Sequence, residues 1–164
     1  MKNRKGFTLV ELVVIVIIIG IISSFAWPKM RHLIQVLRLD GAVLVIQNQL
    51  ISARTCAIIN FDHYGVYFNL AASPQSSLIF IDNGTAAVDT NVHTVNDHIY
   101  TLPAKLPDGV TFSSSTLTDS SFIFRGDGSV YRGGQIVLQS ISAKDTIRTA
   151  IDVLASTGRV KVLK

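Results

Sequence analysis

The chain opens with a long apolar segment that holds one charged side chain. Between Phe7 and Pro28 the sole charged residue is Glu11. The 21 residues 7–27, each rising about 1.5 Å in a helix, span roughly 32 Å, close to the roughly 30 Å hydrocarbon core of a bilayer. A charge inside such a segment costs about 2.5 to 3.5 kcal/mol, so we expect Glu11 to need a cationic partner at its own depth.

A second helical pattern follows the apolar segment. From Lys29 onward, apolar residues recur every three or four positions, which is the spacing of one helix face. The set comprises Leu33, Val36, Leu39, Val43, Ile46, Leu50, Ala53 and Ala57. We expect this stripe to be buried against a globular domain and the helix to end near Asn60.

Other residues of the same helix predict a bend and a polar surface. Pro28 removes a backbone donor and clashes with the preceding turn, so we expect a kink there. The polar residues that fall away from the stripe are Arg31, Arg38, Gln47, Gln49 and Arg54. Their positions predict a surface that faces solvent or another subunit.

After Asn60 the pattern changes to short β-rich runs separated by turn residues. Strands are predicted at residues 63–70, 78–81, 98–102, 110–113, 121–125, 135–140, 146–154 and 159–163. Turns are predicted at residues 83–84, 108–109 and 127–128, and the polar stretch 85–97 predicts an exposed loop. One long helix packed on an antiparallel β-domain, residues 61–164, belongs to the α+β class.

The residues before the apolar segment supply a candidate partner for Glu11. Cleavage after Gly6 would make Phe7 the new N-terminus, with its α-amino group one helical turn from Glu11. That ammonium group could pair with the carboxylate of its own chain or of a neighbour. A pair between chains would set the axial register of two helices.

The N-terminal sequence Lys5-Gly6-Phe7-Thr8-Leu9-Val10-Glu11-Leu12 resembles the class III signal of type IV pilins and type II secretion pseudopilins. The resemblance implies a pilin-like fold and processing by a prepilin peptidase, which cuts between Gly6 and Phe7 and N-methylates Phe7. It also implies that Glu11 serves subunit assembly with other pseudopilins or pilins. The chain then divides into a cleaved leader, residues 1–6, a transmembrane and assembly helix, residues 7–27, and an amphipathic helix, residues 28–60, that continues into the globular domain.

An ordinary secretory signal peptide is the competing interpretation of the N-terminus. Residues 1–5 carry three cations, residues 12–22 form an apolar core, and residues 24–26 fit a small-x-small cleavage site. A freely secreted protein cut after Ala26 would result. Glu11 disfavours this interpretation, because such an apolar core has no use for an acid at its edge.

Segments from the middle and the second half of the chain resemble one branch of this superfamily. Residues 50–58, 65–68, 122–128, 134–138, 151–153 and 157–160 resemble the H-type minor pseudopilins and their type IV pilus relatives (GspH/FimT). The resemblance implies a single-pass inner-membrane subunit with its C-terminal domain in the periplasm. Such a subunit joins a type II secretion pseudopilus at or near its tip and supports protein export across the outer membrane. The alternative is a minor type IV pilus subunit that acts in pilus assembly or in DNA binding and uptake.

Charge gives weak support for a DNA partner. The formal charge is +4, but three of the 15 basic residues lie in the leader and 11 residues are acidic, so the processed chain carries +1. Basic residues gather near the C-terminus, and the candidate DNA contacts are Arg159, Lys161 and Lys164, with Lys144 and Arg148 nearby. Asp145 and Asp152 dilute this group, so a solvated strand face is favoured over a DNA site.

No pattern predicts an enzyme. Three histidines, His63, His93 and His98, lie among aspartates, but their spacing fits no zinc motif, and the phosphate-binding pattern G-x-x-x-x-G-K-[ST] is missing. We therefore expect no catalytic residue, metal or cofactor. Cys56 is the sole cysteine, which excludes an intramolecular disulfide and predicts a small core residue. The letters Arg-Gly-Asp at residues 125–127 more plausibly close a hairpin than mediate adhesion.

Overall fold

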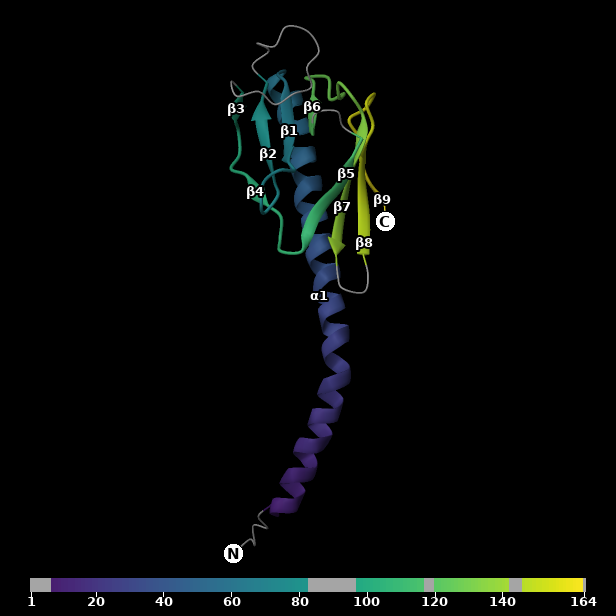
Figure 1. Cartoon of the computed structure of the whole chain (residues 1–164). Coiled ribbons are helices and arrows are strands. Elements are labelled where there is room, and N and C mark those ends of the chain that lie inside the picture. The colour runs from purple at the N-terminus through teal and green to yellow at the C-terminus, as the bar shows by residue number, and fades with distance from the viewer. Residues whose placement is uncertain (1–6, 83–96, 117–119, 142–145, 164) are drawn as a thin grey trace, which may run out of the picture. The chain divides into compact units, whose positions relative to one another are not determined.

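The computed structural model describes residues 7–82, 97–116, 120–141 and 146–163 (Figure 1). Within these residues, one helix, α1 (Leu9–Asn60), precedes nine strands. The strands are β1 (Tyr64–Asn69), β2 (Ser76–Ile81), β3 (His98–Ile99), β4 (Ala104–Lys105), β5 (Val110–Ser115), β6 (Ser121–Phe124), β7 (Gly134–Ile141), β8 (Thr146–Val153) and β9 (Val160–Leu163). The chain divides into two compact units, Met1–Gln35 and Val36–Lys164, which are described separately below.

Both ends of α1 are closed by local hydrogen bonds. At the start, Thr8 is the N-cap, since its Oγ1 accepts from the Glu11 backbone N–H at 3.2 Å. At the end, the backbone N–H of Asp62 donates to the carbonyl of Ala57 at 3.2 Å, and Phe61 adopts a φ of 52°. This is the Schellman arrangement that commonly terminates a helix. The helix therefore ends at Asn60, as the sequence predicted.

The strands form two antiparallel sheets within the second unit. The first has the order β3-β2-β1-β6, with β4 also pairing with β2, and the second has the order β5-β7-β8-β9. In the first sheet Val66 lies opposite Ile79 and Phe122, and in the second Ile136 lies opposite Ile151. Figure 1 shows both sheets along residues 36–60 of α1.

One core joins this part of α1 to both sheets. It holds side chains of α1 such as Ile46 and Leu50, which are fully buried, together with Phe68 of β1 and Leu138 of β7. The predicted stripe is confirmed from Leu39 to Ala57. It is wrong at its start, because Leu33 is 51% exposed and lies in the first unit, before the second begins at Val36.

The strand predictions are largely confirmed, with two differences. The predicted strand 98–102 pairs as β3 over two residues only, because Tyr100 and Thr101 both direct their backbone N–H groups at the carbonyl of Ile79. The short strand β4 was not predicted. The predicted turn at residues 83–84 and most of the predicted loop 85–97 lie outside the described residues.

The Arg125–Gly128 segment is a tight turn after β6. The backbone N–H of Gly128 donates to the carbonyl of Arg125 at 2.8 Å, and the backbone N–H of Arg125 donates to the carbonyl of Ser129 at 2.9 Å. Asp127 Oδ1 accepts from the backbone N–H of Ser129 at 2.8 Å and from its hydroxyl at 2.6 Å. The hairpin interpretation of the Arg-Gly-Asp letters is confirmed.

A second glycine turn packs on the first. Gly158 has a φ of 60°, and a Cβ placed there would collide with the carbonyl oxygen of Gly128. That same oxygen accepts a hydrogen bond from Arg54 Nε at 3.1 Å. Gly158 is thus required both for its backbone conformation and for the close approach of two turns to α1.

We expect Gly158→Ala to lower the free energy of unfolding by about 2 to 4 kcal/mol, because strain at positive φ adds to the displaced Gly128 carbonyl and its bond to Arg54. Gly109→Ala is the matched control. Gly109 has a φ of 83° but open space around its Cβ position, so only the conformational cost of about 1 kcal/mol applies. Urea unfolding followed by circular dichroism measures both, and equal losses would contradict the packing argument.

We further expect Ser129→Ala to raise the pKa of Asp127. Hydrogen bonds from the Ser129 hydroxyl and then from its backbone N–H hold the pKa of this carboxyl below its ordinary 3.8. The lowered pKa makes a stabilising contribution that is present above pH 3.8 and is lost as pH falls through the folded-state pKa. An NMR titration of the side-chain carboxyl measures the change, with Ser129→Thr, which keeps the hydroxyl, as control. An unchanged pKa in Ser129→Ala would show that the hydroxyl is not the main cause.

Candidate assembly site on the N-terminal helix

The first turn of α1 fixes the position of Glu11. With Thr8 as N-cap, Glu11 is the third helical residue, and the two form the T-x-x-E pattern of a capping box. A carboxylate in the first turn also interacts favourably with the helix dipole. Phe7 lies just before the helix, and both Phe7 and Glu11 are exposed. Gly6, on the other side of the predicted cut, lies outside the described residues.

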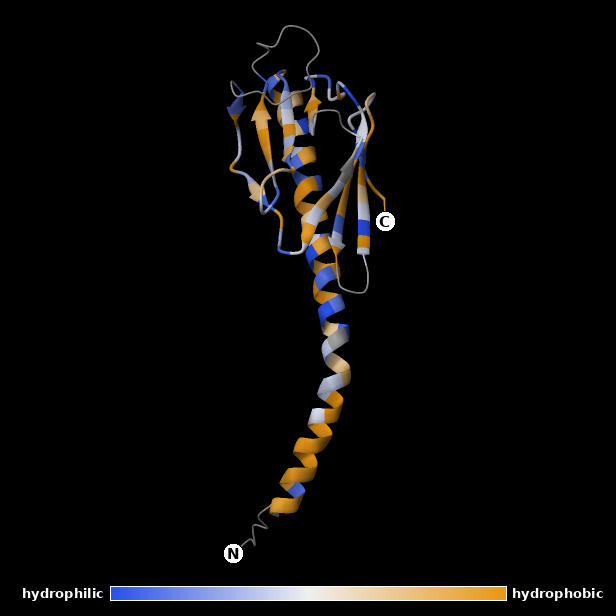
Figure 2. Ribbon diagram, viewed as in Figure 1, coloured by the Kyte–Doolittle hydropathy of each residue, from blue (hydrophilic) through white to orange (hydrophobic). Residues whose placement is uncertain are grey.

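The first unit exposes a continuous apolar helix surface. The large apolar side chains of residues 9–27 are between 43% and 80% exposed, and Figure 2 shows them as a run of hydrophobic ribbon. By length and composition this helix is suited to cross a membrane. An apolar surface of this size marks contact with lipid or with other proteins.

The end of the apolar surface carries an aromatic and a cation in contact. The guanidinium of Arg31 lies 5.4 Å from the centre of the Trp27 ring, a cation–π distance. Trp and Arg at the end of an apolar helix are typical of a membrane–water boundary. Helical structure is assigned throughout this region, including at Pro28, and the kink at Pro28 stays a prediction.

Two residues predicted to face solvent or another subunit instead fasten α1 to the β-domain. Gln49 accepts a hydrogen bond from the Ser77 hydroxyl at 2.5 Å, and Arg54 binds the Gly128 carbonyl. Both side chains are half-buried. The prediction is wrong for these two because they flank the buried stripe closely enough to reach polar groups of the sheet and turn. Arg38 is exposed, yet its Nη1 also donates to the Asp108 carbonyl at 3.1 Å.

The candidate DNA contacts do not form a group of one sign. Lys161 of β9 lies directly opposite Asp152 of β8, which reduces the local positive charge. Arg148 lies opposite Gln139, and Arg159 is exposed just before β9. Lys144 and Lys164 lie outside the described residues. The DNA contact therefore stays a prediction.

The other reactive side chains take part in ordinary packing. Cys56 is half-buried against the core, so the predicted burial is only partly correct, and its thiol lies 3.9 Å from the Tyr100 hydroxyl. This hydrogen bond raises the pKa of Tyr100 above its ordinary 10.0. His63 Nε2 lies 3.3 Å from the Tyr131 hydroxyl, and His98 is exposed on the edge strand β3. Within the described residues, no three His, Cys, Asp or Glu side chains are grouped as a metal site.

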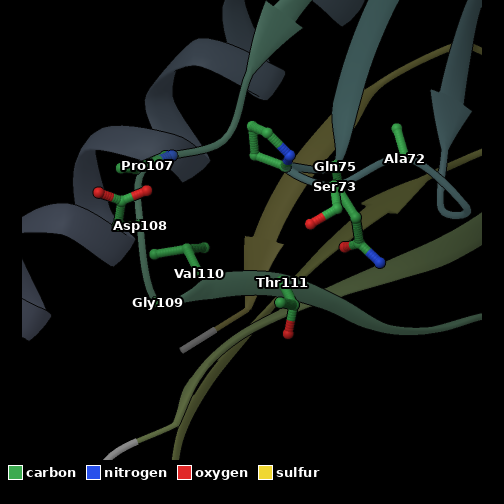
Figure 3. Close-up of a pocket in the computed structure, with 9 residues that line it drawn as sticks. Ala72, Ser73, Gln75, Pro107, Asp108, Gly109, Val110 and Thr111 are labelled. Atoms are coloured by element: carbon green, nitrogen blue, oxygen red, sulfur yellow. The ribbon is translucent and has the colours of Figure 1, made fainter.

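Two of the surface pockets formed by described residues lie on the second unit. One, of about 410 Å³, lies between the segment before β2 and the start of β5, and Figure 3 shows its lining side chains. The side-chain amide of Gln75, which lines this pocket, already makes two hydrogen bonds within the protein. Its Oε1 accepts from the Phe112 backbone N–H at 2.6 Å, and its Nε2 donates to the Leu70 carbonyl at 2.9 Å. The other, of about 520 Å³, runs along α1 beside Cys56 and Tyr100. Neither brings together an acid, base or nucleophile arrangement typical of catalysis.

Sequence reasoning missed the cap at Thr8 and the fastening role of Gln49 and Arg54. The T-x-x-E spacing of Thr8 and Glu11 was a usable signal for the cap. No comparable signal exists for Arg54, because its partner, the Gly128 carbonyl, is 74 residues away in the chain.

Comparison with known proteins agrees with this geometry. A model of the prokaryotic N-terminal methylation motif matches residues 1–27. No curated protein matches the sequence. Among solved structures, the chain is similar to the minor pseudopilin EpsH from the type 2 secretion system of Vibrio cholerae, with a TM-score of 0.54 and 9% sequence identity. The similarity covers 77% of this chain and 96% of that one.

The motif includes the start of α1, where Thr8 is the N-cap, and the matched structure shares the arrangement of a helix followed by antiparallel sheets. Together they show an N-terminal methylation motif joined to a pilin-like fold that is similar to that of a minor pseudopilin.

Proposed function

We propose that the chain is a minor pseudopilin of a type II secretion pseudopilus, incorporated at or near the filament tip, where it supports protein export across the outer membrane. One observation carries the proposal: an N-terminal methylation motif is joined to an H-type pseudopilin fold. Prepilin peptidase is the first partner. It cuts between Gly6 and Phe7 and methylates the new amino group of Phe7.

The anchor explains where the protein acts before assembly. Residues 9–27 hold the chain in the inner membrane as a single span, since their exposed apolar side chains match the lipid core. The leader cations Lys2, Arg4 and Lys5 remain in the cytoplasm by the positive-inside rule. The β-domain then lies in the periplasm.

The first turn of α1 explains how the subunit joins a filament. Thr8 starts the helix, which places the Glu11 carboxylate one turn from the Phe7 amine. In an apolar environment an ammonium–carboxylate pair is stronger than in water, and an unpaired charge is expensive. Pairing of Glu11 with the Phe7 amine of a neighbouring pseudopilin therefore favours one axial register. The role is structural, without a catalysed reaction.

A minor type IV pilus subunit is the alternative, because pili use the same processing and the same fold class. The two roles separate in a deletion strain. Loss of secretion with normal pili supports the pseudopilin, whereas loss of pili or of DNA uptake supports the pilus subunit. Arg159 and Lys161 would matter in the second case alone.

We expect Glu11→Ala to leave membrane insertion intact but to lower incorporation into filaments about 10- to 100-fold, since a hydrogen bond to a charged group is worth about 1.5 to 3 kcal/mol. Glu11→Gln, which keeps the shape without the charge, should behave alike. Immunoblots of sheared filaments and of membranes measure the protein incorporated into filaments and the protein held in the membrane. Normal incorporation of Glu11→Ala would refute this assembly role.

Processing provides the second test of the proposal. The intact mass and N-terminal sequence of the protein from its native membrane should show a chain that begins with methylated Phe7. A chain that begins at Trp27 outside the membrane would refute the pseudopilin function and support a secreted protein.

A further inference from the structure

A bulky aromatic residue follows α1 in a backbone conformation that suits glycine. Phe61 has a φ of 52°, in the left-handed region where glycine or asparagine is usual at the end of a helix. Its side chain is 87% exposed, so packing within the described residues does little to offset this strain. A residue that the fold itself does not favour is a candidate for contact with another molecule.

The backbone that carries Phe61 is held in place by its neighbours. The backbone N–H of Asp62 donates to the carbonyl of Ala57, and the backbone N–H of His63 donates to Asp62 Oδ1 at 2.7 Å. Gly126 approaches so closely that a Cβ placed there would lie 3.0 Å from the Phe61 Cα. Phe61 is therefore an exposed aromatic side chain on a fixed backbone, the type of residue on which protein contacts depend most.

A positive charge adjoins Phe61. Arg125 directly precedes Gly126, and its guanidinium lies 3.9 Å from the centre of the Tyr131 ring, which restricts its motion. Within the described residues this guanidinium contacts the ring and makes no ion pair, and Asp127 of the same turn is bonded to Ser129. This end of the domain thus presents an aromatic ring beside a positioned cation.

A pocket elsewhere on the same domain has the complementary features. It has a volume of about 410 Å³, and its apolar lining comes from Ala72, Pro74, Pro107 and Val110, with Asp108 at its edge (Figure 3). A cavity of about 150 Å³ is enough for a benzene molecule, so a phenyl ring fits this one. Asp108 is exposed, and its carboxylate makes no ion pair in the part of the chain that the structure describes.

The ring and the pocket lie at opposite ends of the helix segment in the second unit. Arg38, near the start of this segment, donates to the Asp108 carbonyl, whereas Phe61 follows its last residue. The roughly 23 residues between Arg38 and Phe61 correspond to about 35 Å along the helix axis. The ring of one copy therefore cannot enter the pocket of the same copy.

We propose that Phe61 of one copy of this chain inserts into the pocket of a second copy, with Arg125 of the first copy facing Asp108 of the second. The proposal rests on the proposed function for one point: subunits of a filament point the same way, so the Phe61 end of one domain faces the pocket end of the next. The contact joins two different surfaces, and contacts of this kind build stacks rather than closed symmetric pairs.

The other charges at the two ends favour the same occupant. Asp62 and Asp127 are exposed beside Phe61, and Arg38 is exposed beside the pocket. In a stack of two copies these opposite charges approach each other, as do Arg125 and Asp108, which favours this partner over one without such charges.

Disulfide cross-linking between two differently tagged copies of the full-length protein, in cells that assemble filaments, tests the proposal. In a Cys56→Ser background, one copy carries Asp62→Cys beside the anchor and the other carries Ser73→Cys in the pocket lining. The matched control replaces the first change by Leu102→Cys, at a residue that is 88% exposed. After mild oxidation we expect a product with both tags from positions 62 and 73, at least about tenfold more than from positions 102 and 73. Neither cysteine alone should give a dimer.

Phe61→Gly separates a role in the contact from a role in the fold. Glycine removes the strain at positive φ, so the thermal midpoint should rise by about 2 to 5 °C. Cross-linking between positions 62 and 73 should nevertheless fall at least about tenfold, because the ring that fills the pocket is gone. Leu102→Ala is the control and should leave the cross-link unchanged. A lower midpoint, or an unchanged cross-link, in Phe61→Gly would contradict the proposed contact.

A charge exchange tests the second part of the contact. Arg125→Glu in the first copy should lower the cross-link about fivefold, and Asp108→Arg in the second copy should restore it, since the pair is then present in reverse. Arg148→Glu, at an exposed residue of β8, should have no effect. Failure of the second change to restore the product would show that Arg125 and Asp108 do not meet.

The yields and masses of the products also show how the proposal can fail. Equal yields from both cysteine pairs would indicate random collision, and a dimer from a single cysteine would indicate a symmetric contact. A product of another mass would assign Phe61 to a different subunit. The intact mass of the same samples separates the two hypotheses: a processed, membrane-held chain without cross-links refutes the stack alone, whereas an unprocessed or released chain refutes the proposed function.

Discussion

Burial of one helix face between two sheets is the contact on which the rest of the structure depends. The side chains of the buried stripe between Leu39 and Ala57 have almost no exposed surface, and they share a core with β1 and β6 of one sheet and β7 and β8 of the other. Burial of one large aliphatic side chain is worth about 1.5 to 3 kcal/mol, as much as a hydrogen bond from a charged group, and the stripe holds several such side chains. Within the described residues no strand pairs across the two sheets, so they are joined in one core by the helix and by side-chain contacts such as that between the Phe68 and Phe112 rings, 5.4 Å apart.

Polar contacts then fix how the helix is seated. Apolar packing is not directional, so it cannot by itself set rotation and axial position. Arg54 on one flank of the buried stripe and Gln49 on the other bind groups of known geometry, the Gly128 carbonyl and the Ser77 hydroxyl. The positive φ of Gly128 and Gly158 brings that carbonyl within reach. These contacts hold the helix at one rotation relative to the two sheets.

Local signals in the sequence predicted the features that depend on neighbouring residues. The helix end at Asn60, most strand positions and the turn at residues 127–128 follow from spacing and turn chemistry. The division into two sheets did not follow, because strand pairing joins residues far apart, such as Val66 and Phe122. The hydrogen bond from Arg54 to Gly128 was not predicted for the same reason. The predicted buried stripe began too early, at Leu33, since periodicity alone does not show where the packed domain begins.

The motif at the start of the chain was predictable because its parts lie close together in the sequence, and under the proposed function a neighbouring subunit completes the site. A carboxylate in an apolar segment is tolerated where a cation meets it, and the proposed processing would create such a cation, the amine of Phe7. Thr8 sets the helix start and hence the height of Glu11 relative to that amine. Any residue that shifted the cap by one position would rotate Glu11 by about 100° and raise it by about 1.5 Å. Under the proposed function, Thr8 would therefore influence assembly through the helix start that it caps.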